Sequence, residues 1–279
     1  MPEDGVAFER AGASGDRIVF LGHATFLLEL GGVRLLTDPL LRARVAHLRR
    51  QVPPIAEQVT GGVRAALVSH MHLDHLDLAS LRLLGLDTPL IVPAGAEQWL
   101  RRRGFTDVRA LGVGESGHVG AVGVTAVEAR HDGRRHPGGV RAQTVGYLVR
   151  GASQDTSDAT GDGTGAVGSA VYFAGDTELF EGMSDLGPGI DAALLPVAGW
   201  GSKLGAGHMD PLDAARAASL IKPRLAIPMH WGTLLPIGAS RTRRARLRGP
   251  AELFARHVAE LAPTVEVRIL TPGEAVVLR

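Results

Sequence analysis

Short apolar runs separated by glycines set the pattern at the start of this chain. Residues 17–21, 25–30 and 33–37 are three such runs, and Gly22 and the pair Gly31-Gly32 divide them. Runs of this length that end at glycine predict strands, and a two-residue Gly-Gly connection predicts a tight hairpin between the second and third strands.

Further along, apolar runs alternate with segments of helical spacing. The strand pattern returns at 65–69, 90–92, 108–111, 122–129, 144–150, 171–174, 191–195, 225–227, 265–270 and 275–278, and the helical pattern at 76–84, 95–103, 211–221 and 251–261. Asp210 is a plausible N-cap for the helix that starts at Pro211. Because strands and helices interleave throughout, the chain is predicted to form a layered α/β or α+β fold.

One low-complexity segment, residues 151–169, interrupts this pattern with Gly, Ser, Thr, Ala and Asp. It lacks the apolar side chains needed to fold by itself. Since it lies between two predicted strands, we interpret it as a flexible hairpin loop and not as a domain boundary. The chain is therefore predicted to be a single domain over residues 1–279.

Composition narrows the picture further. The 279 residues carry a formal net charge of +1 and contain no cysteine. The balanced charge gives no overall argument for binding nucleic acid or membranes, and the lack of cysteine excludes disulfides and thiolate ligands. The acidic start, residues 1–5, does not resemble a secretory signal, and no apolar run reaches membrane-spanning length. We therefore expect a cytoplasmic protein without a transmembrane segment.

The most informative segment is residues 69–77, which reads Ser-His-Met-His-Leu-Asp-His-Leu-Asp. It places His70, His72, Asp74 and His75 directly after a buried strand. Imidazole and carboxylate groups are the ligands that zinc and similar divalent ions prefer. The alternative is a polar loop that happens to be rich in histidine, but four such groups are hard to bury without a cation.

Three later strands also end in a residue of this type. His131 follows the strand predicted at 122–129, Asp176 the one at 171–174, and His230 the one at 225–227. A single histidine after a strand is usually structural or exposed, and each of these taken alone would be read that way. With the cluster at 70–75 already present, they become further candidate metal ligands, because loops beyond strands are where rigid scaffolds carry their chemistry.

Taken in order, these residues resemble the metal-binding motifs of the metallo-β-lactamase superfamily. Gly22-His23-Ala24-Thr25, Thr37-Asp38-Pro39 and Met229-His230-Trp231-Gly232-Thr233 are similar to the branch that holds N-acyl phosphatidylethanolamine phospholipase D and ascorbate-6-phosphate lactonase. The resemblance implies a four-layer αβ/βα sandwich with two metal ions. It implies that His70, His72 and His131 hold one ion, that Asp74, His75 and His230 hold the other, and that Asp176 bridges them.

The expected chemistry is hydrolysis. Two divalent ions about 3.5–4 Å apart can share a water and generate a bridging hydroxide, which would attack a carbonyl carbon or phosphorus. Zinc is the default for nitrogen and oxygen ligands, and manganese and iron are alternatives. Asp74 is expected to orient the hydroxide. His208, in a glycine-rich loop before a helix, is predicted to donate a proton to the leaving group or to stabilise the oxyanion; a structural role at the helix start is the alternative.

Several other polar or aromatic residues allow either a functional or a structural interpretation. His23 either holds a metal ligand by a hydrogen bond or is a structural residue of its turn. Asp132, Arg134, Arg135 and His136 either meet an anionic substrate or form a solvated loop. Arg241, Arg243, Arg244, Arg246 and Arg248 place five arginines in eight residues, which either bind phosphate or form a solvated face. Trp99 is expected in the core, and Trp200 and Trp231 either pack or line the pocket.

The leading hypothesis is a binuclear metal-dependent hydrolase that cleaves an ester, lactone or phosphodiester bond of a small or lipid-like, and in one reading anionic, substrate. A nucleic-acid phosphodiesterase that uses the arginine run 241–248 is the first alternative, although the run lacks the interleaved aromatic residues that stack on single strands. A non-catalytic metal-binding protein is the second, and it would require missing ligands. The sequence does not define an oligomeric state.

Overall fold

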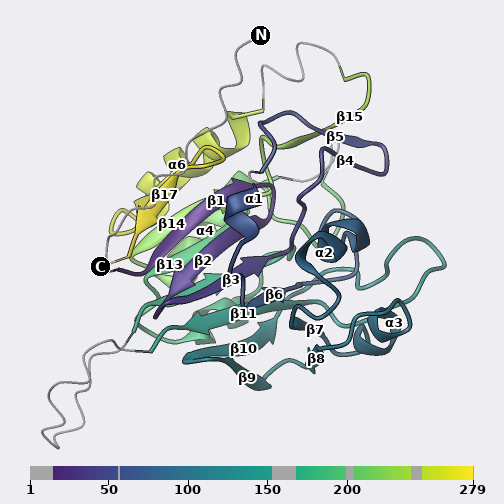
Figure 1. Ribbon diagram of the computed structural model, residues 1–279. Helices are drawn as coiled ribbons and strands as arrows, with labels where there is room; N and C mark the ends of the chain where they lie inside the picture. The colour runs from purple at the N-terminus through teal and green to yellow at the C-terminus, as the bar shows by residue number, and fades with distance from the viewer. Residues whose placement is uncertain (1–14, 56, 153–167, 199–203, 240–246, 279) are drawn as a thin grey trace, which may run out of the picture.

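Two seven-stranded sheets form the centre of the molecule (Figure 1). The computed structural model describes residues 15–55, 57–152, 168–198, 204–239 and 247–278. The first sheet contains, in spatial order, β17 (Ala275–Val277), β1 (Arg17–Gly22), β2 (Thr25–Leu30), β3 (Val33–Thr37), β6 (Ala65–Leu67), β7 (Leu90–Pro93) and β8 (Val108–Leu111). The second contains β16 (Glu266–Val267), β14 (Leu225–Met229), β13 (Ala192–Pro196), β12 (Ala170–Phe173), β11 (Val145–Arg150), β10 (Val122–Glu128) and β9 (Ser116–Val119).

Helices cover the outer face of each sheet. On the first sheet lie α1 (Glu57–Thr60), α2 (Leu78–Leu84) and α3 (Glu97–Arg101), whose side chains share apolar clusters with strands of that sheet. On the second lie α4 (Pro211–Ile221), α6 (Gly249–Leu261) and the 3-10 helix η1 (Glu181–Leu186). The resulting order, helices, sheet, sheet, helices, is the four-layer αβ/βα sandwich that the sequence predicts.

The strands are apolar on both faces because both faces are covered. In β1, Ile18 and Phe20 point into the core between the sheets, whereas Val19 and Leu21 belong to the cluster on the outer face. Phe20 also packs against Phe26 of β2, with ring centroids 4.9 Å apart. Each such side chain, once buried, stabilises the fold by roughly 1.5–3 kcal/mol, so the alternation of faces fixes the register of the strand.

Most of the predicted elements are confirmed. The Gly31-Gly32 turn joins β2 to β3 with Leu30 opposite Val33, and both glycines have positive φ, 54° and 75°, as a tight hairpin requires. Helix α4 has the predicted bounds, and the Asp210 side chain accepts hydrogen bonds from the Leu212 and Asp213 amides. The strand predicted at 265–270 is shorter, since only Glu266 and Val267 pair with a neighbour.

A third, smaller sheet was not predicted. It consists of β15 (Leu234–Pro236), β5 (Leu48–Arg50) and β4 (Arg44–Val45). Strands of two or three residues carry too short a pattern to be recognised. The elements β9, α1 and η1 were missed for the same reason, because each lacks a run of apolar residues.

The low-complexity segment connects β11 to β12, which pair antiparallel, as the hairpin interpretation requires. Residues 153–167 lie outside the described residues, so the flexibility expected there, and the single-domain organisation of 1–279, stay predictions. Among the described residues, no helix is both long and apolar enough to cross a membrane.

Candidate metal centre

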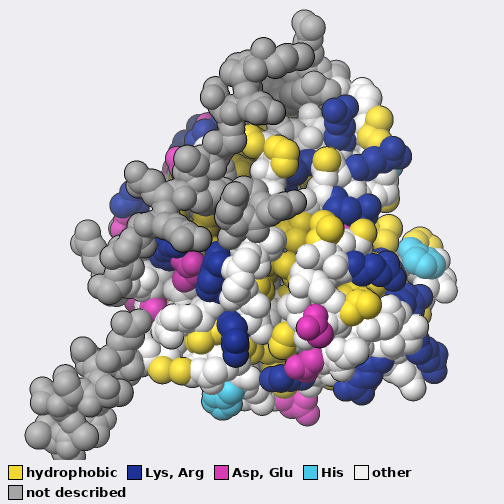
Figure 2. Space-filling model, in the orientation of Figure 1, with side chains coloured by type: hydrophobic (Ala, Val, Ile, Leu, Met, Phe, Trp, Pro, Cys, Tyr) yellow, Lys and Arg dark blue, Asp and Glu magenta, His cyan; other side chains and the backbone are white. Residues whose placement is uncertain are grey.

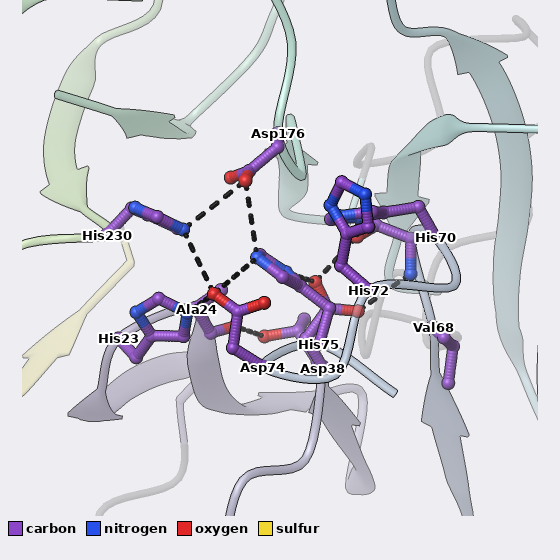
Figure 3. A network of polar contacts seen from close by, with 12 residues as sticks. His23, Ala24, Asp38, Val68, His70, His72, Asp74, His75, Asp176 and His230 are labelled. Atoms are coloured by element: carbon purple, nitrogen blue, oxygen red, sulfur yellow. Dashed lines mark hydrogen bonds and ion pairs between the residues drawn. The ribbon is translucent and has the colours of Figure 1, made fainter. Parts of the chain in front are cut away.

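Both sheets contribute to one polar cluster at their shared edge (Figure 3). In the first sheet, β6 leads through Ser69 into the loop that carries His70, His72, Asp74 and His75. In the second sheet, the ends of β10, β12 and β14 lead into His131, Asp176 and His230. The structure therefore brings all seven predicted ligands together, although they span 161 residues of sequence, from residue 70 to residue 230.

His70, His72 and His131 form the first group of donors. The Nδ1 atom of His72 lies 3.0 Å from the Nε2 atoms of both His70 and His131. The Nδ1 atom of His131 is 2.7 Å from the Gly207 carbonyl oxygen. Because a carbonyl only accepts, His131 carries its hydrogen on Nδ1, and the lone pair of Nε2 in the neutral ring faces the other two rings. Three ring nitrogens that converge in this way can hold a metal ion.

Asp74, His75 and His230 form the second group, with Asp176 beside it. The Asp176 Oδ2 atom lies 3.3 Å from the Nε2 atoms of both His75 and His230. The Asp74 Oδ2 atom is 3.8 Å from His75 Nε2 and 3.7 Å from His230 Nε2. Figure 3 shows these side chains pointing toward one another from the loops that follow β6, β12 and β14.

Two buried atoms in this cluster have no hydrogen-bond partner among the described residues. They are Nε2 of His75 and Oδ1 of Asp176, in side chains that are 0% and 3% exposed. A buried polar atom without a partner costs about 1–3 kcal/mol, so such atoms call for a further ligand. The donor set is nitrogen and carboxylate oxygen in two clusters. Asp176 lies beside both, because its carboxylate is also within 4.8 Å of a ring nitrogen of His131 in the first cluster. These residues fit a pair of divalent metal ions.

The charges of the cluster are divided between its two halves. Burial lowers the pKa of His131 to about 4 and holds the pKa of His70 well below its ordinary value. In the second half the carboxylates outweigh burial, so that Asp176 raises the pKa of His230 to about 9. Burial opposes ionisation of Asp176 as well, but His230 and His75 hold its pKa well below the ordinary value. The first half therefore offers neutral nitrogen donors, and the second an ionised carboxylate.

A buried aspartate, Asp38, holds in place the loop that carries four of the predicted ligands. Its Oδ1 accepts from the Ser69 amide at 2.7 Å, and its Oδ2 accepts from the Ser69 hydroxyl and from Nδ1 of His75, both at 2.6 Å. Orienting a histidine by a carboxylate on its second nitrogen is a common device of metal sites. The sequence contained Asp38 only as part of a family motif, and its role became visible only when β3 and β6 paired.

His23 contacts the cluster from the turn after β1. Its Nε2 atom is 3.1 Å from Asp74 Oδ2, which supports the interpretation that it orients a ligand. His23, Asp38 and His230 have positive φ angles of 60°, 31° and 62°. Non-glycine residues with positive φ are strained and occur most often at functional sites. Three separate chain segments next to the cluster are therefore held in energetically unfavourable backbone conformations.

His208, whose catalytic role stays a prediction, also reaches the cluster. Its Nε2 atom lies 3.5 Å from Asp176 Oδ2, and the hydrogen bond to Asp176 raises its pKa. Its ring lies edge-on to that of His131 at 4.6 Å between centroids. The side chain is 19% exposed, so it lies at the boundary between the cluster and solvent.

Arg135 points inward and not toward solvent. Its Nη1 donates to the carbonyl oxygens of Met71 and Leu76, at 2.9 and 3.0 Å, on either side of the loop that carries His72, Asp74 and His75. Its guanidinium group lies 4.6 Å from the centroid of the Trp99 ring. Arg135 therefore neither faces a substrate nor forms part of a solvated loop. Its side chain connects the loop of His131 to the loop of residues 71–76.

The remaining candidates lie apart from the donors. The Trp231 ring is 7% exposed and stacks at 6.2 Å on Phe20, which supports packing, and Trp99 is partly buried beneath arginine side chains. Arg248 precedes α6 and lies 3.7 Å from Glu252. Trp200, Arg241, Arg243, Arg244 and Arg246 fall outside the described residues.

Comparison with known proteins identifies the family. A model described as "Beta-lactamase superfamily domain" matches residues 33–231, which include every predicted ligand. The chain belongs to the metallo-β-lactamase superfamily. Within that superfamily it is 34% identical to a protein of Rubrobacter xylanophilus named "UPF0173 metal-dependent hydrolase", over 93% of this chain and 96% of the relative.

Two other similar proteins support the branch and the fold. The N-acyl-phosphatidylethanolamine-hydrolyzing phospholipase D 1 of Caenorhabditis elegans is 29% identical over 81% of this chain and 66% of its own length. The solved structure of Igni18, a metallo hydrolase from Ignicoccus hospitalis, has a TM-score of 0.67 and 24% identity, and the match covers 95% of this chain and 99% of that one. The predicted superfamily, branch and fold are thereby confirmed.

Proposed function

We propose that the protein is a hydrolase with two divalent metal ions, and that it cleaves an ester, lactone or phosphodiester bond of a small or lipid-like substrate. The observation that carries the proposal is that Asp176 lies beside both groups of candidate donors, 3.3 Å from His75 and His230 and within 4.8 Å of His131. His70, His72 and His131 would hold one ion, and Asp74, His75 and His230 the other. The metal-dependent hydrolase and the phospholipase among the relatives support the reaction class and the lipid-like end of the substrate range.

The bound ions would supply Lewis acidity and lower the pKa of an attacking water. The chain's own residues would provide the rest of the chemistry. Asp74 lies at the edge of the second donor group, where its carboxylate can accept a hydrogen bond from the attacking water and orient it. His23, by its hydrogen bond to Asp74, would fix the direction of that carboxylate.

We propose that His208 acts on the leaving-group side of the reacting bond, opposite the water that Asp74 would orient. Its Nε2 atom lies next to Asp176 and is partly exposed, so a substrate entering from solvent would meet it. From there an Nε2–H group can donate to the leaving oxygen or to a developing oxyanion, a contribution of typically 10²–10⁴-fold for proton transfer.

Metal content and activity test the proposal together. Purified protein should contain two equivalents of zinc, manganese or iron by elemental analysis, and Asp176→Asn should lose metal and activity toward a panel of esters, lactones and phosphodiesters. Asp213→Asn, a partly exposed aspartate on α4 away from the cluster, is the matched control and should keep both. His208→Asn should keep its metal and lose kcat. A wild-type protein that binds at most one ion under saturating metal would refute the binuclear proposal.

A further inference from the structure

Two stretches of the sequence that contribute strands to the small sheet are basic and contain no acidic residue. Residues 39–56 and 228–251 contain nine of the thirty lysines and arginines and none of the twenty-nine aspartates and glutamates. The rest of the chain therefore has an excess of eight acidic residues, although the net charge is only +1. Such an asymmetry is typical of a surface that binds a polyanion.

The structure places two of these arginines directly opposite each other. Arg44 of β4 and Arg49 of β5 are register partners, and both are exposed. Like charges in opposite positions of neighbouring strands destabilise a sheet. Within the part of the chain that the structure describes, neither arginine forms an ion pair with an acidic side chain. The pair is thus an unfavourable arrangement that an external anion would relieve.

The end of the small sheet at the β4–β5 turn also exposes an apolar side chain. Ile237 follows β15, is 51% exposed, and its amide donates to the carbonyl of His47 at the tip of the β4–β5 turn. In Figure 2, the upper right of the molecule, where Figure 1 places β4, β5 and β15, shows dark blue and yellow side chains and no magenta ones. We call Arg44, His47, Arg49 and Ile237 the basic tip.

The basic tip is built onto the metal centre. At the open end of the β4–β5 hairpin, away from its turn, Arg42 forms a two-point ion pair with Asp77, two residues after His75. At the same end, the Gln51 amide donates to the carbonyl of Thr233, three residues after His230. A partner held at the basic tip is therefore coupled through short chain segments to the second group of donors.

We propose that the basic tip docks the protein onto a lipid bilayer that contains anionic headgroups. Arginines around an exposed aliphatic side chain are suited to such an interface, because the charges bind the headgroups while the apolar group enters the acyl boundary. A nucleic acid fits less well, since Trp231 is the single aromatic residue of the two basic stretches and is buried, so that bases have no stacking platform.

Vesicle co-sedimentation of the full chain tests the docking surface without any turnover, so its outcome is separate from the proposed hydrolysis. The protein should bind vesicles of phosphatidylcholine mixed with phosphatidylglycerol, and binding should fall with salt. Arg44→Gln/Arg49→Gln should weaken binding about 30-fold, or about 2 kcal/mol at 1.4 kcal/mol per factor of ten, while the melting temperature stays the same or rises as the like-charge pair is removed. Arg82→Gln/Arg256→Gln, two exposed arginines elsewhere, should bind as wild type.

The apolar contact gives an independent measurement. Ile237→Ser should also weaken binding, and this loss should persist at high salt because burial of an aliphatic side chain is not screened. Equal binding to pure phosphatidylcholine, equal binding by both double variants, or binding of a fluorescent oligonucleotide in place of vesicles would each overturn the assignment.

Discussion

Replacing Arg135 with alanine should loosen the loop that carries most of the predicted ligands. The side chain donates two hydrogen bonds, to the carbonyls of Met71 and Leu76, and lies over the Trp99 ring. Burial, with the Arg103 charge nearby, lowers its pKa to about 10, so the guanidinium is still charged at neutral pH. The substitution would remove a charged donor that serves both ends of the loop.

The expected loss follows from these contacts. Hydrogen bonds to a charged donor are worth about 1.5–3 kcal/mol each, and we take the lower value because the side chain is half-buried. The contact with Trp99 adds about 0.5–1 kcal/mol. The free energy of unfolding should therefore fall by about 3.5–4 kcal/mol, which corresponds to a melting temperature lower by roughly 7–16 °C for a chain of this size.

Denaturant unfolding and metal titration measure the two consequences. Arg134→Ala is the matched control, since Arg134 is adjacent in sequence and its side chain is exposed. Arg135→Lys, which keeps the charge but offers a smaller donor group, should recover part of the stability. Metal affinity, measured by competition with a coloured chelator, should fall in Arg135→Ala and not in the control. If Arg135→Ala matches Arg134→Ala within 0.5 kcal/mol, the role given to Arg135 is wrong.

Three further predictions concern stability. The Asp77 carboxylate accepts hydrogen bonds from Ser80, as the N-cap of α2, and from Arg42. Asp77→Ala should therefore lower the free energy of unfolding in urea by about 2 kcal/mol, of which about 1 comes from the N-cap and up to about 1 from the ion pair with half-exposed Arg42. An unchanged midpoint would contradict this. Gly133→Ala should lower the melting temperature, since a Cβ atom there would lie 1.9 Å from the Ala142 carbonyl oxygen, whereas Gly249→Ala, with no atom within 4 Å, should be neutral. Chelation of the metals should lower the melting temperature of the wild type. If the metal is first present at a thousand times its Kd, the loss of stability should be about 4 kcal/mol. The Asp176→Asn variant, which is expected to contain no metal, should be unaffected.

The sequence predicted the elements and residue types that depend on local patterns. The hairpin at Gly31-Gly32 and the bounds of α4 are set by two or three residues each, so they could be recognised. The ligand types were equally visible, since His70, His72, Asp74 and His75 stand together and the others follow strands. Their use as ligands stays a prediction, which the geometry supports.

What could not be predicted depends on contacts between distant segments. Arg135 looks like any exposed loop arginine until the structure places the Met71 and Leu76 carbonyls within its reach. Asp38 is an isolated carboxylate in the sequence, and only the pairing of β3 with β6 brings it to Ser69 and His75. The small sheet escaped notice because its strands are too short to show a period.

The division of the donor residues between the two sheets has a mechanical consequence. His70, His72, Asp74 and His75 move with the first sheet, and His131, Asp176 and His230 move with the second. An ion held by both sets would cross-link the two sheets. A force that separates the sheets would then act on the metal–ligand bonds before it acted on the apolar interface. Bound metal should therefore raise the force needed to separate the two sheets far more than the force needed to pull along the strands of either sheet.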